Sequence, residues 1–129
     1  MAALGEQRLA DVLDAVAAPT PAPGGGSTAG IVCALAAALV EMVAGIGDGD
    51  VAAVRALRAR ALDLAEQELS SYAPVLEARR LPADDPARPG RIAAALEQAS
   101  AAPREIAAVA AEVAALAERA GSRAGAAVR

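Results

Sequence analysis

Apolar residues along the chain recur with the period of an α-helix, and stretches rich in glycine and proline divide this pattern into four parts. In the first part, Leu9, Val12, Leu13 and Val16 share one helix face. The predicted helices cover Glu6 to Ala18, Ser27 or Thr28 to about Ile46, Val51 to Arg80, and Arg91 to Arg119. Residues 19–26, 47–50 and 81–90 are predicted loops, and residues 121–129 are predicted to be weakly structured.

Two of these predicted helices contain an internal proline, Pro74 in the third and Pro103 in the fourth. Proline removes a backbone donor and clashes with the preceding turn, so we expect a kink or a break at each position. Helices joined by short loops throughout predict an all-α fold, an up-and-down antiparallel bundle of about four long helices. No domain boundary is evident, so residues 1–129 are expected to form a single domain.

The second predicted helix, STAGIVCALAAALVEMVAGI, is apolar on nearly all sides. Such a helix lies either at the centre of an assembly or in a membrane. Its uncharged run extends from Ser27 to Val40, where Glu41 interrupts it, and is shorter than the roughly 18–20 residues of a membrane span. We therefore expect no membrane partner, and a homodimer or higher oligomer that forms through this helix.

Glu41 lies on the side of this helix that carries small residues such as Gly30 and Ala37. Small side chains allow another helix to approach closely. Two environments remain open for Glu41. It either reaches solvent at a subunit edge, which we favour, or it is a second carboxylate of a functional site.

The composition limits the possible chemistry. A net charge of −4 disfavours nucleic acid as a partner. The chain has no histidine, which excludes a zinc site of the usual His/Cys type and leaves acid–base work to carboxylates, Tyr72, Cys33 or backbone groups. Cys33 lies in an apolar run, so a buried, unreactive thiol is expected. A lone cysteine and the lack of a signal-peptide pattern favour a cytoplasmic location.

The stretch PAPGGGST, residues 21–28, is the first candidate for a binding site. Successive glycines let backbone N–H groups face a concavity, and a helix start adds a partial positive charge. The stretch is neither a Walker loop nor a dinucleotide fingerprint, because no GK[ST] follows it and no strand precedes it. The alternative is an ordinary interhelical loop, although a flexible linker gains nothing from the rigid Pro-Ala-Pro lead-in.

The third predicted helix has an apolar arc that contains a carboxylate. The arc consists of Val54, Leu57, Ala61, Leu64, Ala65, Leu69, Tyr72, Val75 and Leu76. Glu68 lies within it, one turn before Tyr72. Desolvation favours the protonated form of a carboxyl group, which suits a general acid. The alternative is a structural ion pair of Glu68 with Arg58 or Arg79, which fall on the same arc.

Four segments together resemble the cyclodeaminase/cyclohydrolase family, whose helical domain is also the C-terminal part of formiminotransferase-cyclodeaminase. The segments are LADVLDAVAAPTPAPGGGSTAG, AAALVEMVA, YAPVLEARRLP and AALEQASAAPREIAAVAAEVAAL. The first is the most specific, with a short helix, a proline-rich entry, PGGGS and a helix rich in alanine and glycine. The resemblance covers essentially the whole chain.

The resemblance implies folate one-carbon chemistry without a prosthetic group. Family members close 5-formimidoyltetrahydrofolate to 5,10-methenyltetrahydrofolate with loss of ammonia, or hydrolyse the methenyl form to 10-formyltetrahydrofolate. They are helical dimers that bind folate in a cleft near the subunit interface. The site residues carried over are the loop Pro23, Gly24, Gly25, Gly26 and Ser27. Glu68 stands where the family usually has an aspartate four residues before a tyrosine, here Tyr72.

One departure from the family pattern keeps other functions open. The family normally continues into a further helix, whereas this sequence ends at Arg129. This difference favours a non-catalytic folate-binding relative as the first alternative to an enzyme. The second alternative is a helical dimerisation module without a ligand, which applies if the glycine loop is only a connector. The sequence leaves open which of the two reactions applies, whether polyglutamate is preferred, and whether Glu41 or Arg91 joins the site.

Overall fold

The structure, a computed structural model, describes residues 2–47 and 49–127, and these residues are helical apart from short connections, with no β-strand among them. The elements are a 3₁₀ turn, η1 (Leu4–Glu6), and the α-helices α1 (Leu9–Ala17), α2 (Gly25–Ile46), α3 (Val51–Ser71), α4 (Ala73–Arg79), α5 (Arg88–Ala99) and α6 (Ala101–Ala127). The all-α, up-and-down arrangement is therefore confirmed. In it, α3 with α4 and α5 with α6 form two long, interrupted helices.

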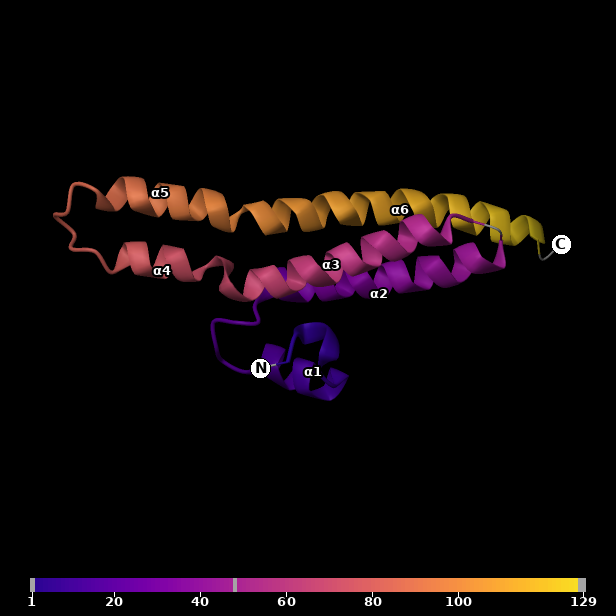
Figure 1. The fold of residues 1–129 in the computed structure, drawn as a ribbon, viewed down its shortest axis with the longest axis horizontal. Coiled ribbons are helices and arrows are strands. Elements are labelled where there is room, and N and C mark those ends of the chain that lie inside the picture. Colours follow the sequence, from indigo (N-terminus) through magenta and orange to yellow (C-terminus); the bar gives the residue numbers. More distant parts are fainter. Residues whose placement is uncertain (1, 48, 128–129) are drawn as a thin grey trace.

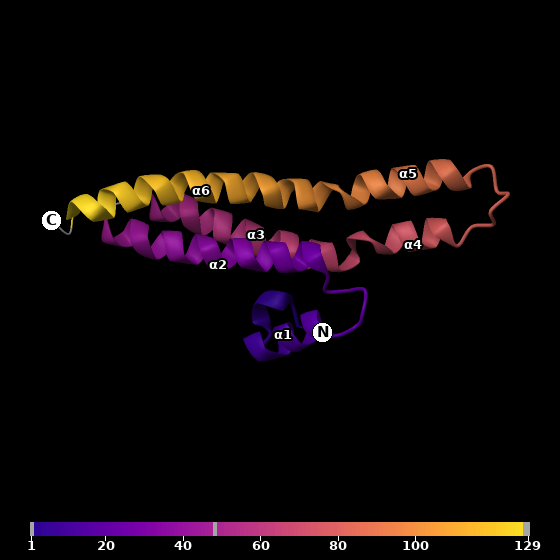
Figure 2. The ribbon, with the colours of Figure 1, turned by 180° about the vertical axis from the view of Figure 1, so that it is seen from behind.

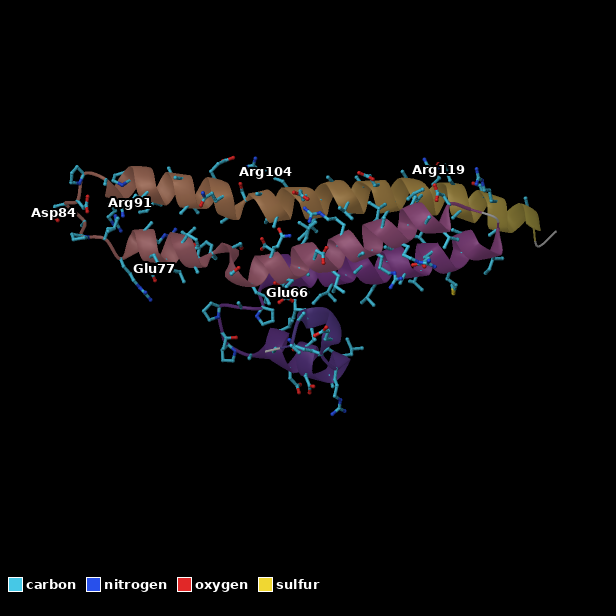
Figure 3. The ribbon with its side chains drawn as sticks, viewed as in Figure 1. Glu66, Glu77, Asp84, Arg91, Arg104 and Arg119 are labelled. Carbon is cyan, nitrogen blue, oxygen red and sulfur yellow. The ribbon has the colours of Figure 1, made fainter. Side chains whose placement is uncertain are left out.

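The molecule has a three-helix part and a two-helix part (Figure 1). Helices α2, α3 and α6 lie side by side, and α4 and α5 continue beyond them as a narrower hairpin. The view from behind shows the same arrangement, with α1 beside the start of α2 and away from α6 (Figure 2). We refer to the residues from Ala73 to Ala99 as the α4–α5 hairpin. Figure 3 shows Asp84 and Arg91 at its far end.

The main core fills the space between the three long helices. It contains mostly small and medium-sized apolar side chains: Cys33, Ala37, Val40, Ala44, Val54, Ala61, Leu64, Ala102, Ile106, Val109, Val113 and Ala120. A second, smaller core of Val75, Ala78 and Ala95 joins the two helices of the hairpin. Small side chains let α2 approach α3 closely. A Cβ atom at Gly30 would lie only 2.8 Å from Ala65 Cβ.

The two predicted helix breaks are confirmed. Tyr72 separates α3 from α4, and Pro74 lies in the first turn of α4, where its missing N–H costs least. Ser100 separates α5 from α6, and Pro103 lies in the first turn of α6. Both connecting residues keep α-like backbone angles, so each interruption is a joint between nearly continuous helices. We call these positions the Tyr72 joint and the Ser100 joint.

Several predicted helix boundaries are wrong. The first helix begins at Leu9, and Glu6 belongs to the separate η1 turn. The N-cap of α2 is Gly24, because the hydroxyl groups of Ser27 and Thr28 donate hydrogen bonds to carbonyl oxygens of Ala65 and Gly24 instead of capping the helix.

The last two helices also differ from the prediction. Helix α5 begins at Arg88 instead of Arg91, because Pro89 fits a first helical turn as well as it fits a loop. The tail predicted to be weakly structured continues α6 as far as Ala127. Its alanines favour helix, and a Cβ atom at Gly47 would lie 2.8 Å from Ala124 N, so the tail packs closely against the end of α2.

Helix α1 is held to the bundle through η1. The Leu4 N–H donates a 2.7 Å hydrogen bond to Glu66 Oε2 on α3, and the Leu4 side chain is buried. On α1 itself Val12 is buried, whereas Leu9 and Leu13 are exposed. The predicted apolar face of the first helix therefore exists, but the described residues of this chain cover only part of it.

Helix α2 exposes a row of large apolar side chains on its outer side. These side chains, Val32, Leu35, Leu39, Met42 and Ile46, are each more than half exposed. We call this row the outer face of α2. Among the described helices, α2 is long and apolar enough to cross a membrane when its full length, including Glu41, is counted, so the shortness of the uncharged run does not by itself exclude a span. The central helices of many soluble proteins share this property. Surface apolar area of this extent marks a site of interaction.

Candidate functional site

The glycine loop is extended up to Gly24 and becomes helical at Gly25. No described glycine has a positive φ angle, so backbone freedom does not explain the three successive glycines. The N–H groups of Gly25, Gly26 and Ser27 meet no hydrogen-bond acceptor within the described part of the chain. Together with the helix dipole, they form an electropositive start of α2 that suits a carbonyl or anionic group.

Gly26 leaves room for the side chain of Glu68. A Cβ atom at position 26 would lie 1.8 Å from Glu68 Oε2 and 2.6 Å from its Cδ. The carboxylate of Glu68 therefore lies directly against the backbone of the first turn of α2. Glycine is the residue that leaves room for it there.

Glu68 has no ion-pair partner among the described residues. Arg58, one of the two predicted alternatives, pairs with Glu41 instead, and the second, Arg79, makes no contact with the Glu68 carboxylate. The Oε1 atom of Glu68 is buried and has no hydrogen-bond partner in residues 2–47 and 49–127. A shielded carboxylate oxygen without a partner is costly, so this atom is a vacant position for a hydrogen-bond donor.

The glycine loop, Glu68 and Tyr72 line one cavity of about 330 Å³. This volume is within the usual range for small-molecule sites. The start of α2 and the Tyr72 and Ser100 joints surround the cavity, which we call the Glu68 cavity. Its lining residues are Pro21, Gly24, Gly25, Gly26, Ser27, Glu68, Ser71, Tyr72, Leu96, Ala99, Ser100 and Pro103.

Tyr72 combines a backbone and a side-chain role at this cavity. Its backbone forms the joint between α3 and α4, and its side chain, 44% exposed, lines the cavity. An exposed aromatic ring with a phenolic hydroxyl provides both a flat apolar surface and a hydrogen-bonding group. The structure thus brings Tyr72 and Glu68 to one cavity, as the helical spacing indicates.

Ser27 is placed differently from the rest of the loop. Its side chain is only 1% exposed, and Oγ donates a 2.9 Å hydrogen bond to the Ala65 carbonyl of α3. The hydroxyl group therefore points into the contact between α2 and α3, although other atoms of the residue line the cavity. A direct contact of this hydroxyl with a ligand stays a prediction.

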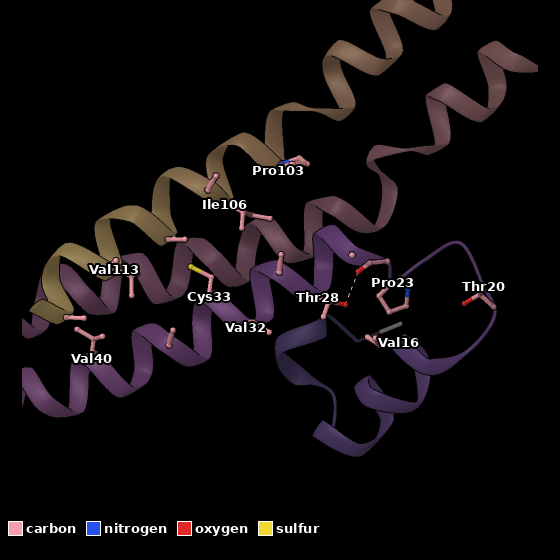
Figure 4. Close-up of a pocket in the computed structure, with 18 residues that line it drawn as sticks. Val16, Thr20, Pro23, Thr28, Val32, Cys33, Val40, Pro103, Ile106 and Val113 are labelled. Carbon is pink, nitrogen blue, oxygen red and sulfur yellow. Dashed lines mark hydrogen bonds between the residues drawn. The ribbon is translucent and has the colours of Figure 1, made fainter.

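A second, larger hollow lies on the other side of the glycine loop. This apolar groove of about 1070 Å³ runs along α2 and α6, and Figure 4 shows Cys33, Ile106 and Val113 along it. Pro23 lines this groove and not the Glu68 cavity, whereas Gly24, Gly25 and Pro103 line both. Of the five predicted loop residues, four therefore line the Glu68 cavity, and Pro23 lines only the groove.

Cys33 in this groove has the environment expected from the sequence. Its side chain is buried in the main core, and burial raises the pKa of its thiol, which keeps the thiol protonated and unreactive.

Glu41 forms ion pairs within the chain, which neither of its two predicted environments included. Its two carboxylate oxygens each accept a hydrogen bond of 2.8 Å, one from Arg55 Nε and one from Arg58 Nε of α3. Its side chain is 15% exposed. The hydrogen bond from Arg55, followed by the one from Arg58, lowers the pKa of Glu41. Glu41 thus pairs α2 with α3 and does not line the Glu68 cavity.

Arg91 also lies outside the Glu68 cavity. It lines a hollow of the α4–α5 hairpin together with Glu77 and Gln98, near the far end of the molecule (Figure 3). Among the described residues, no group of histidine, cysteine or acidic side chains could hold a metal ion.

Sequence reasoning missed the part of the cavity that the fourth long helix supplies. Leu96 lies in α5, one turn before the Ser100 joint, and Ser71 is the last residue of α3, directly before the Tyr72 joint. The signal for these residues was Pro74 and Pro103, because a proline break exposes the residues just before it.

Comparison with known protein families shows the family of the chain. Among curated proteins and solved structures, none matches the chain. The sequence profile of the family described as Formiminotransferase-cyclodeaminase matches residues 8–128, which is nearly the entire chain. That family acts in folate one-carbon metabolism, in agreement with the resemblance of the PGGGS loop and the segments that follow it. The chain therefore belongs to the formiminotransferase-cyclodeaminase family, as a copy of its C-terminal, helical cyclodeaminase domain.

Proposed function

We propose that this protein is an enzyme that acts on a C–N bond of a tetrahydrofolate. The observation that supports this proposal is the single cavity that is lined by the glycine loop, with its free N–H groups, by the carboxylate of Glu68 and by Tyr72. Hydrogen-bond donors and an acceptor in one cavity suit a ligand that both accepts and donates, as a folate with a formimidoyl group does. The family membership supports the same chemistry.

The first candidate reaction is closure of 5-formimidoyltetrahydrofolate. N10 attacks the formimidoyl carbon, a new C–N10 bond forms, and the carbon becomes tetrahedral. The bond from this carbon to the formimidoyl nitrogen then breaks, which gives the 5,10-methenyl cation. The departing nitrogen gains two protons and leaves as ammonia, with one proton derived from N10 and one from solvent.

In this reaction the residues of the chain bind, orient and move a proton. The N–H groups at the start of α2 hold an acceptor atom of the ligand. The cavity keeps N10 and the formimidoyl carbon in contact, which supplies the proximity contribution. The carboxyl group of Glu68, with Tyr72 beside it, carries the proton from N10 to the departing nitrogen. No prosthetic group or metal takes part in these steps.

Hydrolysis of 5,10-methenyltetrahydrofolate is the second candidate, and it passes through a tetrahedral carbon at the same place. Water adds to the methenyl carbon, the bond to N5 breaks, and the products are 10-formyltetrahydrofolate and a proton. The same carboxyl group of Glu68 would accept the proton of the attacking water.

We also infer that the protein forms a homodimer, or a higher oligomer, through α2. The outer face of α2 and the apolar groove beside it share Val32 and form one continuous apolar surface. A second copy of α2 would cover this surface. Such a dimer is expected to work in the cytoplasm on a small folate molecule, without nucleic acid and without a membrane.

Two measurements test the proposed function. The methenyl chromophore absorbs light, so a spectrophotometric assay should show it appear from the formimidoyl substrate or disappear from the methenyl substrate. The melting temperature should rise when a tetrahydrofolate derivative binds. A rise in melting temperature without turnover would indicate a non-catalytic folate-binding protein. No rise and no turnover would favour a helical dimerisation module.

A further inference from the structure

The first two turns of α2 contact α3 at three consecutive points. Gly26 lies against the Glu68 carboxylate, Ser27 donates a hydrogen bond to the Ala65 carbonyl, and Gly30 lies against Ala65. The first and third contacts are limited by sterics alone, because glycine has no side chain that holds a partner. The hydrogen bond of Ser27 is the one directional contact of the three.

The buried location of this hydrogen bond allows it to fix the position of Gly26 relative to Glu68. Both partners are buried, so water does not compete for the Ser27 hydroxyl. The carbonyl of Ala65 lies three residues before Glu68 on α3, which is close to one helical turn. A bond between Ser27 and Ala65 therefore fixes how far the neighbouring Gly26 backbone lies from the side chain of Glu68.

We propose that Ser27 is a positioning residue that holds the glycine loop against Glu68, and that its hydroxyl group does not contact the ligand. Without the hydrogen bond of Ser27, the start of α2 can move away from α3, and the Glu68 carboxylate loses its contact with the backbone of Gly26. The effect of this movement on turnover rests on the proposed function. The movement of α2 away from Glu68 does not depend on that function.

The experiment compares Ser27→Ala with Thr28→Ala, which is a matched control. Both variants remove one hydroxyl hydrogen bond from the first turn of α2. The Thr28 hydroxyl donates to the Gly24 carbonyl within the same turn, at 2.9 Å, whereas the Ser27 hydroxyl donates across to α3. A structural defect common to the turn would affect both variants, and a loss of positioning would affect only Ser27→Ala.

A nuclear Overhauser effect between Gly26 Hα and Glu68 Hγ reports the contact without any substrate. The Cβ position of Gly26 lies 3.0 Å from Glu68 Cγ, so this signal should be strong in the parent and in Thr28→Ala. We expect the signal to be lost in Ser27→Ala. In an active enzyme, Ser27→Ala should also lower kcat about tenfold or more, with little change in KM. This loss is a part of the rate enhancement that a general acid–base group typically contributes.

An unchanged signal in Ser27→Ala would overturn the proposal, and so would a rise in KM at constant kcat, which indicates a direct ligand contact. If Ser27→Ala does not fold, Ser27→Cys keeps a weaker donor of similar size, and its signal should be weakened but present. An undiminished signal there would also overturn the proposal. If the parent shows no turnover, the proposed function fails, but the Overhauser measurement still decides the position of Glu68.

Discussion

The two hollows beside the glycine loop have opposite characters, although they share Gly24, Gly25 and Pro103. The Glu68 cavity is small and is lined by a carboxylate, by four hydroxyl-bearing residues (Ser27, Ser71, Tyr72 and Ser100) and by a glycine loop with free backbone donors. The groove along α2 and α6 is about three times larger and lined almost entirely by apolar side chains. If the proposed function and the proposed dimer are correct, one short loop serves chemistry on one side and self-association on the other. Changes on each side should therefore have separable effects.

The largest effect on turnover is expected from Glu68→Gln, which changes only the Glu68 cavity and not the groove along α2 and α6. Glutamine keeps the shape of glutamate but cannot exchange a proton, so turnover should fall about 100- to 10,000-fold while folate affinity changes little. Steady-state kinetics and thermal unfolding of the same preparations measure both quantities. Glu66→Gln on the same helix is the control, because Glu66 binds the Leu4 N–H and lies away from the cavity.

Two results would contradict this assignment. Turnover of Glu68→Gln within a few-fold of the parent would leave Glu68 with a structural role. A large loss of stability would show that the charge of Glu68 is needed for folding, for which the structure offers no ion-pair partner among the described residues.

Leu39→Glu should weaken self-association through the outer face of α2 and leave the Glu68 cavity intact. Leu39 is 64% exposed on the outer face of α2, and a buried glutamate there would lack a partner. Loss of one leucine contact and burial of a charge should weaken self-association roughly 100-fold or more. Light scattering across a range of concentrations measures this. Ala111→Glu, on an exposed position of α6 outside the groove, should not change the mass. A stable monomer in the parent would contradict the proposed dimer.

Gly26→Ala should have a smaller effect than the loss of the carboxyl group. The new methyl group would overlap Glu68 Oε2, but the glutamate side chain is flexible and can move aside. We expect turnover to fall on the order of tenfold, with stability nearly unchanged because alanine favours a helix. Kinetics and melting temperature test this against Gly90→Ala, where a Cβ atom meets nothing within 4 Å. Normal turnover in Gly26→Ala would show that the contact of Glu68 with the backbone of Gly26 is not needed.

The smallest effect concerns Glu41 and pH. Its two arginine partners lower its pKa below the usual 4.5, so the folded state is stabilised when Glu41 is ionised. This contribution is complete above the pKa of the unfolded chain and is lost as pH falls through the lower, folded value. Glu41→Gln should therefore melt slightly below the parent at neutral pH, and the two proteins should converge in acid. Because both arginines are exposed, added salt should reduce the difference. An equal gap at neutral and acidic pH would contradict this.

Periodicity predicted the presence of the long helices and the position of Glu68 one turn before Tyr72, whereas the family resemblance placed the glycine loop in the same site. Helical spacing places Glu68 and Tyr72 on one arc of the third predicted helix, and the structure shows that the start of α2 packs against this arc. Other features depend on contacts between distant segments. The pairing of Glu41 with Arg55 and Arg58 depends on the register of α2 against α3, and the continuation of α6 depends on packing against Gly47. Neither the ion pairs of Glu41 nor the length of α6 can be recognised from the neighbouring residues in the sequence.

The Tyr72 and Ser100 joints have a mechanical consequence. They lie opposite each other at the Glu68 cavity, and the whole α4–α5 hairpin extends beyond them (Figure 1). Helix α5 has 12 residues, which correspond to a length of about 18 Å. If the backbone angles at the two joints change, the hairpin rotates as one unit about a point beside the cavity. A rotation of about 10° at this point moves the tip of the hairpin by about 3 Å over that length. A spectroscopic label beside Asp84 would therefore report, in magnified form, any change of backbone angle where the ligand is expected to bind.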